Sequence, residues 1–191
     1  MLLVFIVFCS CGSGLVVRQT GNWDRTDWYG KRVFILPGLG ASGVRFSDPN
    51  PNRLVDKQLK KRLPILPGYR ESNISYYTIT MKILTKKGLW PLFNRTLNRF
   101  RNTGSLDTIL LQKLGKRLQT AYLILPLYLS TKYSSWEFTG IFSYYSAAVE
   151  LVLFETDSGT VVFRVRARGY SLGGPEKAFA SAGEEVVRRF R

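Results

Sequence analysis

The stretch over residues 149–168, VELVLFETDSGTVVFRVRAR, decides the fold. Its first half belongs to an apolar run that predicts a strand over about residues 141–155, and its second half alternates apolar and basic side chains over residues 160–168. Asp157, Ser158 and Gly159 lie between the two and are typical of a tight turn. The stretch therefore predicts an antiparallel hairpin. We expect Val161, Phe163, Val165 and Ala167 on its inward face and Arg164, Arg166 and Arg168 on its outward face.

One helix is predicted before this hairpin in the sequence and one after it. Upstream, Ser105 is a suitable N-cap for a helix whose leucines recur every four residues, and an apolar strand over residues 121–129 follows it. Downstream, Pro175 is a favoured first residue for a last helix that reaches Phe190. The C-terminal half thus reads as helix, strand, hairpin and helix.

The N-terminal half is harder to interpret. A short buried strand is expected over residues 31–36, and the glycines of GLGASG at residues 38–43 follow it in the pattern of a dinucleotide-binding loop. That pattern requires a helix directly after it, and Pro49 and Pro51 prevent one there, so we reject nucleotide binding. We interpret residues 37–70 as a long basic surface loop with a short helical piece near residues 53–62.

Two segments in the middle complete the expected fold. Residues 72–88 fit both a strand and a helix, and residues 89–94, LWPLFN, are expected to be a short strand at a sheet edge. The fold class is then α/β (α+β). It is a two-layer sandwich in which about three helices pack on one face of a small mixed sheet, and it ends in a β-hairpin and a C-terminal helix.

The first residues, MLLVFIVFCSCGSG, are typical of an export signal. Ser10 is the small residue that a lipid-modified cysteine follows, so we expect residues 1–10 to be a lipoprotein-type signal peptide and Cys11 to be the lipid attachment site. Residues 11–30 would be a tether, and residues 31–191 a single domain. The apolar start has no basic residue before it, which leaves open a short uncleaved anchor or a tail that packs on the domain.

The composition excludes several kinds of catalysis. The chain has no histidine, and both of its cysteines lie in the export segment, so the domain has no Cys/His zinc site and no Ser-His-Asp triad. We expect no enzyme activity, no catalytic residue, no cofactor and no metal. The remaining enzymatic alternative uses carboxylates or lysine, and we interpret its clustered acids as surface and turn residues. These acids are Glu137, Glu150, Glu155 and Asp157.

Positive charge is concentrated in one part of the chain. The net charge is +15, and residues 31–133 contain 19 Lys and Arg against 4 Asp and Glu. Such an excess favours a polyanionic neighbour: an anionic surface or an acidic envelope protein for an exported protein, and nucleic acid for a cytoplasmic one. The export signal disfavours nucleic acid. The contact candidates are Arg53, Lys57, Lys60, Lys61, Arg62, Lys82, Lys86, Lys87, Arg95, Arg99 and Arg101.

Three segments carry a resemblance to a known family. They are VFILP at residues 33–37, the leucine helix with Leu114 and Gly115 before the strand at 121–125, and the closing hairpin with its alanine-bearing helix. Together they resemble the superfamily of bacterial envelope lipoproteins that includes CsgG, LpoB and the N-terminal domain of TolB. The resemblance implies a non-enzymatic adaptor, scaffold or assembly accessory, anchored by diacylglycerol and palmitate at the outer membrane and facing the periplasm. It leaves a homo-oligomer open.

Overall fold

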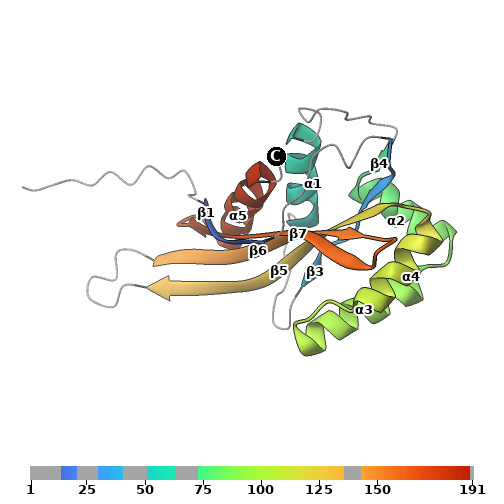
Figure 1. Ribbon diagram of the computed structural model, residues 1–191. Helices are drawn as coiled ribbons and strands as arrows, with labels where there is room; N and C mark the ends of the chain where they lie inside the picture. Colours follow the sequence, from blue (N-terminus) through green and yellow to red (C-terminus); the bar gives the residue numbers. More distant parts are fainter. Residues whose placement is uncertain (1–13, 21–29, 41–50, 63–72, 136–142, 190–191) are drawn as a thin grey trace, which may run out of the picture.

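One seven-stranded mixed sheet organises the computed structural model, which describes residues 14–20, 30–40, 51–62, 73–135 and 143–189 (Figure 1). The strands run in the order β1-β7-β6-β5-β2-β4, and β3 also pairs with β5. Pairing is antiparallel from β1 to β5 and parallel among β5, β2, β3 and β4. The strands are β1 (Gly14–Thr20), β2 (Val33–Ile35), β3 (Leu39–Gly40), β4 (Ile74–Ser75), β5 (Tyr122–Ser135), β6 (Ser143–Glu155) and β7 (Thr160–Ser171).

Helices cover both faces of this sheet. Since successive side chains of a strand point to opposite faces, Val33 and Ile35 join one apolar cluster, and Phe34 and Leu36 join the other. The first cluster includes side chains of α1 (Pro51–Arg62) and α5 (Pro175–Arg189). The second includes side chains of α2 (Tyr77–Lys86), α3 (Trp90–Thr103) and α4 (Thr108–Leu118). The mixed α/β class is confirmed. The arrangement with about three helices on one face of a two-layer sandwich is corrected, because the helices predicted after Ser105 and after Pro175, α4 and α5, pack on opposite faces of the sheet.

The closing hairpin and the last helix are confirmed, with one correction. Leu153 pairs with Phe163 but Phe154 pairs with Val161, so β7 has one extra residue at Val162. Because this bulge reverses the alternation, Val161 packs on the α2–α4 side while Phe163 packs under α5. The prediction that Val161 shares a face with Phe163 was therefore wrong.

Residues 72–94 are mainly helical. The segment that the sequence left open contains the two-residue strand β4 and helix α2. The strand expected over residues 89–94 is wrong: these residues lead into α3, and Pro91 lies in its first turn, where a missing N–H costs nothing. The cap of α4 is also corrected, because Asp107 Oδ1, and not Ser105, accepts a hydrogen bond from the Leu110 N–H at 3.0 Å.

Two expectations for the N-terminal third are revised. Residues 14–20, expected to be part of a tether, form β1 and pair with β7 at the sheet edge. The loop expected over residues 37–70 contains β3 and the twelve-residue helix α1, which buries Val55 and Leu59 in the core. The helical piece expected near residues 53–62 is confirmed. The signal peptide and Cys11 lie outside the described residues.

The sheet extends beyond the helices at one end. β5 and β6 run past the end of α5 and away from α3 and α4, and β1 lies at that same end (Figure 1). The described residues include no helix long and apolar enough to cross a membrane.

Candidate functional site

The predicted basic residues fall into two groups on opposite faces of the sheet. One group belongs to α1, and the other belongs to α2 and α3. Since α1 packs with α5 while α2 and α3 pack on the other face, the two groups do not form one continuous surface. The α1 group is Arg53, Lys57, Lys60, Lys61 and Arg62, and the α2–α3 group is Lys82, Lys86, Lys87, Arg95, Arg99 and Arg101.

Helix α4 adds three further cations to the second group. Residues 77–118 hold nine Lys and Arg against a single acid, Asp107, which caps α4. We call the nine the basic layer: Lys82, Lys86, Lys87, Arg95, Arg99, Arg101, Lys113, Lys116 and Arg117. All nine side chains are exposed, and none forms an ion pair with any residue that the structure describes. Within the part of the chain that the structure describes, the layer therefore presents a positive field that no ion pair compensates.

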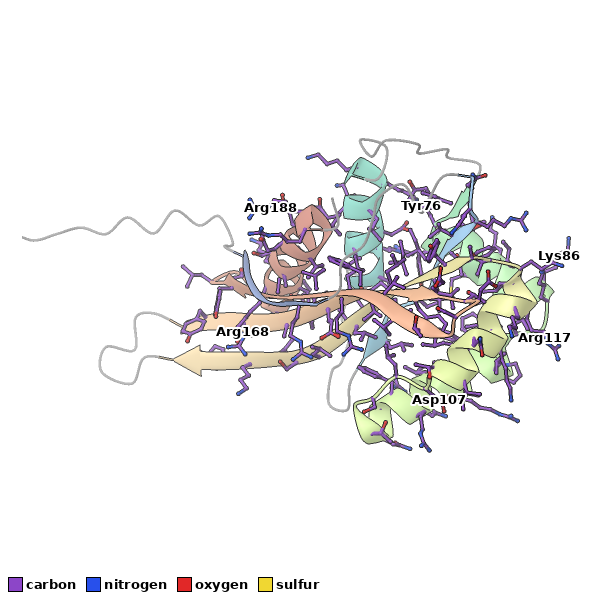
Figure 2. The ribbon with its side chains drawn as sticks, in the orientation of Figure 1. Tyr76, Lys86, Asp107, Arg117, Arg168 and Arg188 are labelled. Carbon is purple, nitrogen blue, oxygen red and sulfur yellow. The ribbon has the colours of Figure 1, made fainter. Side chains whose placement is uncertain are left out.

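The densest part of the basic layer lies where two helices end side by side. Lys87 Nζ, just after α2, donates a hydrogen bond to the carbonyl oxygen of Arg117 in the last turn of α4, at 3.1 Å. Lys86 and Arg117 are seen at this same end of the molecule (Figure 2). Cations are favourable beside carbonyl groups at helix C-termini, which explains why charges of one sign are tolerated here. The sequence does contain a signal for the three cations of α4, because they lie on the helix face opposite its buried leucines.

Lys60 on α1 has a structural role. Its ammonium lies 3.0 Å from Asp56 Oδ2 and 5.1 Å from the centre of the Tyr76 ring. Asp56 is buried and also accepts a hydrogen bond from the Tyr77 backbone N–H at 3.0 Å. These contacts hold α1 to the start of α2, so Lys60 is not available for a partner in the way the basic layer is.

Glu150 is buried, although the sequence suggested a surface residue. It is 1% exposed and binds two arginines of β7: its Oε1 lies 3.0 Å from Arg164 Nε, and its Oε2 lies 2.6 Å from Arg166 Nε. The three side chains line a hollow of about 250 Å³ beside the α3–α4 turn. Each guanidinium offsets part of the desolvation cost of the Glu150 carboxylate. The two arginines therefore explain how a charged side chain can be buried in the sheet.

The other predicted acids do not join Glu150. Glu155 accepts hydrogen bonds from Ser158 Oγ at 2.7 Å and from the Tyr122 hydroxyl at 3.3 Å, so it fixes the β6–β7 turn. Five residues of one strand separate Glu155 from Glu150, roughly 17 Å. For comparison, the two catalytic carboxylates of glycoside hydrolases lie about 5–9.5 Å apart. Glu137 lies outside the described residues.

A buried polar contact holds the loop after β2 against α1. Asn52 Oδ1 accepts hydrogen bonds from the Gly38 N–H at 2.6 Å and from the Tyr128 hydroxyl at 3.3 Å. Burial, and then the charges of Tyr77 and Asp56, raise the pKa of Tyr128 well above its ordinary value. Tyr128 therefore stays protonated as a structural donor.

The comparisons with known proteins test the fold of the chain. No protein-family model and no curated protein sequence matches it. Among solved structures, it aligns with the PelC dodecamer from Paraburkholderia phytofirmans at a TM-score of 0.52 and 12% identity, covering 91% of this chain and 94% of PelC. The chain shares its fold with PelC. A variant of that dodecamer from the same organism aligns at a TM-score of 0.50 and 13% identity, over 91% of this chain and 95% of the other.

A lipoprotein is also among the similar structures. Lipoprotein GNA1162 from Neisseria meningitidis aligns at a TM-score of 0.49 and 11% identity, over 84% of this chain and 97% of that one. At these identities the alignments show the fold alone, so the resemblance to the CsgG, LpoB and TolB superfamily stays a prediction in its finer detail.

Proposed function

We propose that this protein is a non-enzymatic adaptor of the bacterial envelope, anchored at the outer membrane by lipid on Cys11 and assembled as a homo-oligomer. Its basic layer binds an acidic envelope protein. Diacylglycerol and palmitate on Cys11 hold the chain to the membrane, with the domain in the periplasm. Several acyl chains make such anchoring firm, since each buried CH₂ contributes about 0.8 kcal/mol.

The observation that carries this proposal is that the start of β1 and the basic layer lie at opposite ends of β7. Gly14, three residues after Cys11, pairs with Gly169 of β7. The basic layer meets the sheet at the other end of β7, where Gln112 Nε2 of α4 bonds to the Asp157 carbonyl oxygen at 3.1 Å. About ten residues of extended chain, roughly 30 Å, separate these two places. An anchor at one end and a charged contact surface at the other are what an adaptor requires.

Self-association is supported by the fold. PelC, whose fold the chain shares over 91% of its length, is described as a dodecamer. The basic layer is an unsuitable contact between copies, because the described residues form no acidic surface of matching size. We therefore assign the basic layer to a different protein and the copy-to-copy contacts to other surfaces.

A binding experiment with matched variants tests the role of the basic layer. Fluorescent polyglutamate is the probe, titrated into the full chain at physiological ionic strength. The triple variant Lys86→Gln/Lys116→Gln/Arg117→Gln should weaken binding about tenfold, because local charge rather than net charge steers a polyanion. The triple variant Arg53→Gln/Lys57→Gln/Lys61→Gln removes the same charge from α1 and should change binding by less than about twofold.

Two results would count against the proposed function. Equal weakening by both triple variants would mean that total charge alone attracts polyanions. Tighter binding of a DNA duplex than of polyglutamate at the same salt would favour the nucleic-acid alternative. Sedimentation of the detergent-extracted protein tests the oligomer, and a monomer at all concentrations would contradict it.

A further inference from the structure

The end of the sheet that carries the N-terminal strand has an unusual set of exposed side chains. Tyr133 is 59% exposed and Leu172 is 56% exposed, whereas most large apolar residues of the described chain are buried. Three further tyrosines, none of them fully buried, lie on the neighbouring strands. We call this set the tyrosine tip: Tyr133, Tyr144, Tyr145, Tyr170 and Leu172.

The register of the strands brings the tyrosine tip together. Tyr133 of β5 pairs with Tyr145 of β6, and their ring centres are 5.2 Å apart. On the other face, the ring centres of Tyr144 and Tyr170 are 6.1 Å apart. The tip therefore has aromatic rings on both faces of the sheet, and no helix of the described chain covers its end (Figure 1).

The same register places the start of β1 beside this tip. Gly14 pairs with Gly169, Gly169 pairs with Ala147, and Ala147 pairs with Thr131, so the four residues form one row across four strands. The tyrosine tip begins directly beyond this row. β1 runs parallel in direction to β6, since both are antiparallel to β7, so the chain enters β1 from the side of the tip.

The length of chain between Cys11 and Gly14 limits where a lipid on Cys11 can lie. Three residues span at most about 11 Å. β5 extends four residues past the row, to Ser135, which is roughly 13 Å. A lipid on Cys11 therefore lies no farther from the row than the end of the sheet does. With its acyl chains in a bilayer, the tyrosine tip lies within reach of the head groups.

The chemistry of the tip suits that position. Tyrosine is enriched where a membrane meets water, because its ring is apolar and its hydroxyl can stay hydrated. Three basic side chains are exposed around the tip: Lys132, Arg168 and Lys177. Among the described residues there, Glu176 is the single acidic residue. Cations flanking aromatic side chains favour contact with anionic head groups.

We propose that the tyrosine tip docks on the head-group region of the membrane that holds Cys11, so that the long axis of the sheet stands on the bilayer with the basic layer at its far end. This inference rests on the proposed lipid anchor. The partner is a lipid surface and not a second protein, because the chain itself holds the tip within reach of the bilayer.

Quenching of an added tryptophan by brominated lipid tests the orientation. Two variants of the full chain are extracted from membranes and reconstituted into vesicles of phosphatidylethanolamine and phosphatidylglycerol that contain dibrominated phosphatidylcholine. Tyr133→Trp places the reporter in the tip, and Ile109→Trp places it at the exposed start of α4, where Ile109 is 65% exposed. The emission of the parent chain is subtracted. We expect about threefold more quenching for Tyr133→Trp than for Ile109→Trp, since interfacial side chains lie at the depth of the glycerol backbone.

Intact mass of the same protein separates this inference from the proposed function. Lipid on Cys11 together with equal quenching at the two positions would overturn the docking of the tip and leave the anchor standing. Lipid on Cys11 together with stronger quenching at Ile109→Trp would reverse the orientation. An unmodified Cys11 would overturn the anchor and, with it, the orientation.

Discussion

Gly169 of β7 lies directly against the carbonyl group of Ala178 in α5. A Cβ atom built on Gly169 would overlap that oxygen and the Ala182 nitrogen, both of which are helix backbone and cannot move aside. The absence of a side chain lets α5 approach the sheet closely, where it buries Phe179 and Val186. This contact fixes the position of the last helix.

Gly169→Ala should therefore lower the free energy of unfolding by about 3 kcal/mol, since overpacking against backbone forces the helix away from the sheet. Urea denaturation followed by circular dichroism measures it. Gly183→Ala is the control, because the nearest atom to a Cβ there is a Val55 methyl group at 3.2 Å. It should change stability by less than about 1 kcal/mol. Equal effects would show that α5 does not depend on Gly169.

Thr156→Val should stabilise the protein. The Thr156 hydroxyl is buried and has no hydrogen-bond partner among the described residues. Replacing it by a methyl group removes the cost of an unsatisfied polar atom, which is about 1–3 kcal/mol, and keeps the packing against Gly115. An increase of about 1 kcal/mol in urea denaturation is expected. A decrease would mean that the hydroxyl is satisfied in solution.

Asp107→Ala should destabilise the protein by about 1 kcal/mol, because it removes the side-chain oxygen that caps α4. Ser105→Ala is the matched comparison, since the sequence favoured Ser105 as the cap and the structure does not use it there. We expect less than about 0.3 kcal/mol for Ser105→Ala. A larger loss of stability for Ser105→Ala than for Asp107→Ala would mean that Ser105 caps α4, as the sequence suggested.

Tyr128→Phe should change how stability depends on alkaline pH. The raised pKa means that the folded protein keeps the proton of Tyr128 above pH 10, where the unfolded chain loses it. The stabilising contribution of this tyrosine is thus complete below about pH 10 and decreases above it, by up to about 1.4 kcal/mol per pH unit. Urea midpoints between about pH 9 and 11 should fall less steeply for Tyr128→Phe than for the wild type. Parallel curves would contradict the shift.

Cys11→Ala should move the protein from the membrane fraction to the soluble fraction, because it removes the residue that carries the proposed lipid. Cys9→Ala is the control and should stay in the membrane fraction, since Cys9 belongs to the predicted signal peptide. Wild-type protein in the soluble fraction would contradict the anchor. The measurement is fractionation with immunodetection, followed by intact mass.

The local periodicity of the sequence predicted the C-terminal half well. The strand over residues 121–129, the hairpin and the last helix all correspond to elements of the structure, because alternation and helical spacing are local signals. Val161 was misplaced because a bulge inserts one residue without a sequence pattern of its own. Pro91 was misinterpreted because proline is tolerated both at a sheet edge and in the first turn of a helix.

Non-local pairing explains most of the remaining errors. β1 pairs with β7 across about 150 residues, so nothing near residues 14–20 distinguished a strand from a tether. Glu150 was taken for a surface residue because the sequence does not show that Arg164 and Arg166 enclose it. The tyrosine tip was missed for a similar reason. The alternation of side chains along a strand does not show whether a helix covers a given tyrosine.

The two edges of the sheet are very different, and this limits how copies can join. β4 at one edge has two residues, too few for a partner strand, whereas β1 at the other has seven. Addition of β1 to the β1 of a second copy would use the same edge on both sides, so a joint of this kind closes at two copies and cannot continue into a ring or a fibre. An assembly of more than two copies therefore needs a contact other than β1 against β1.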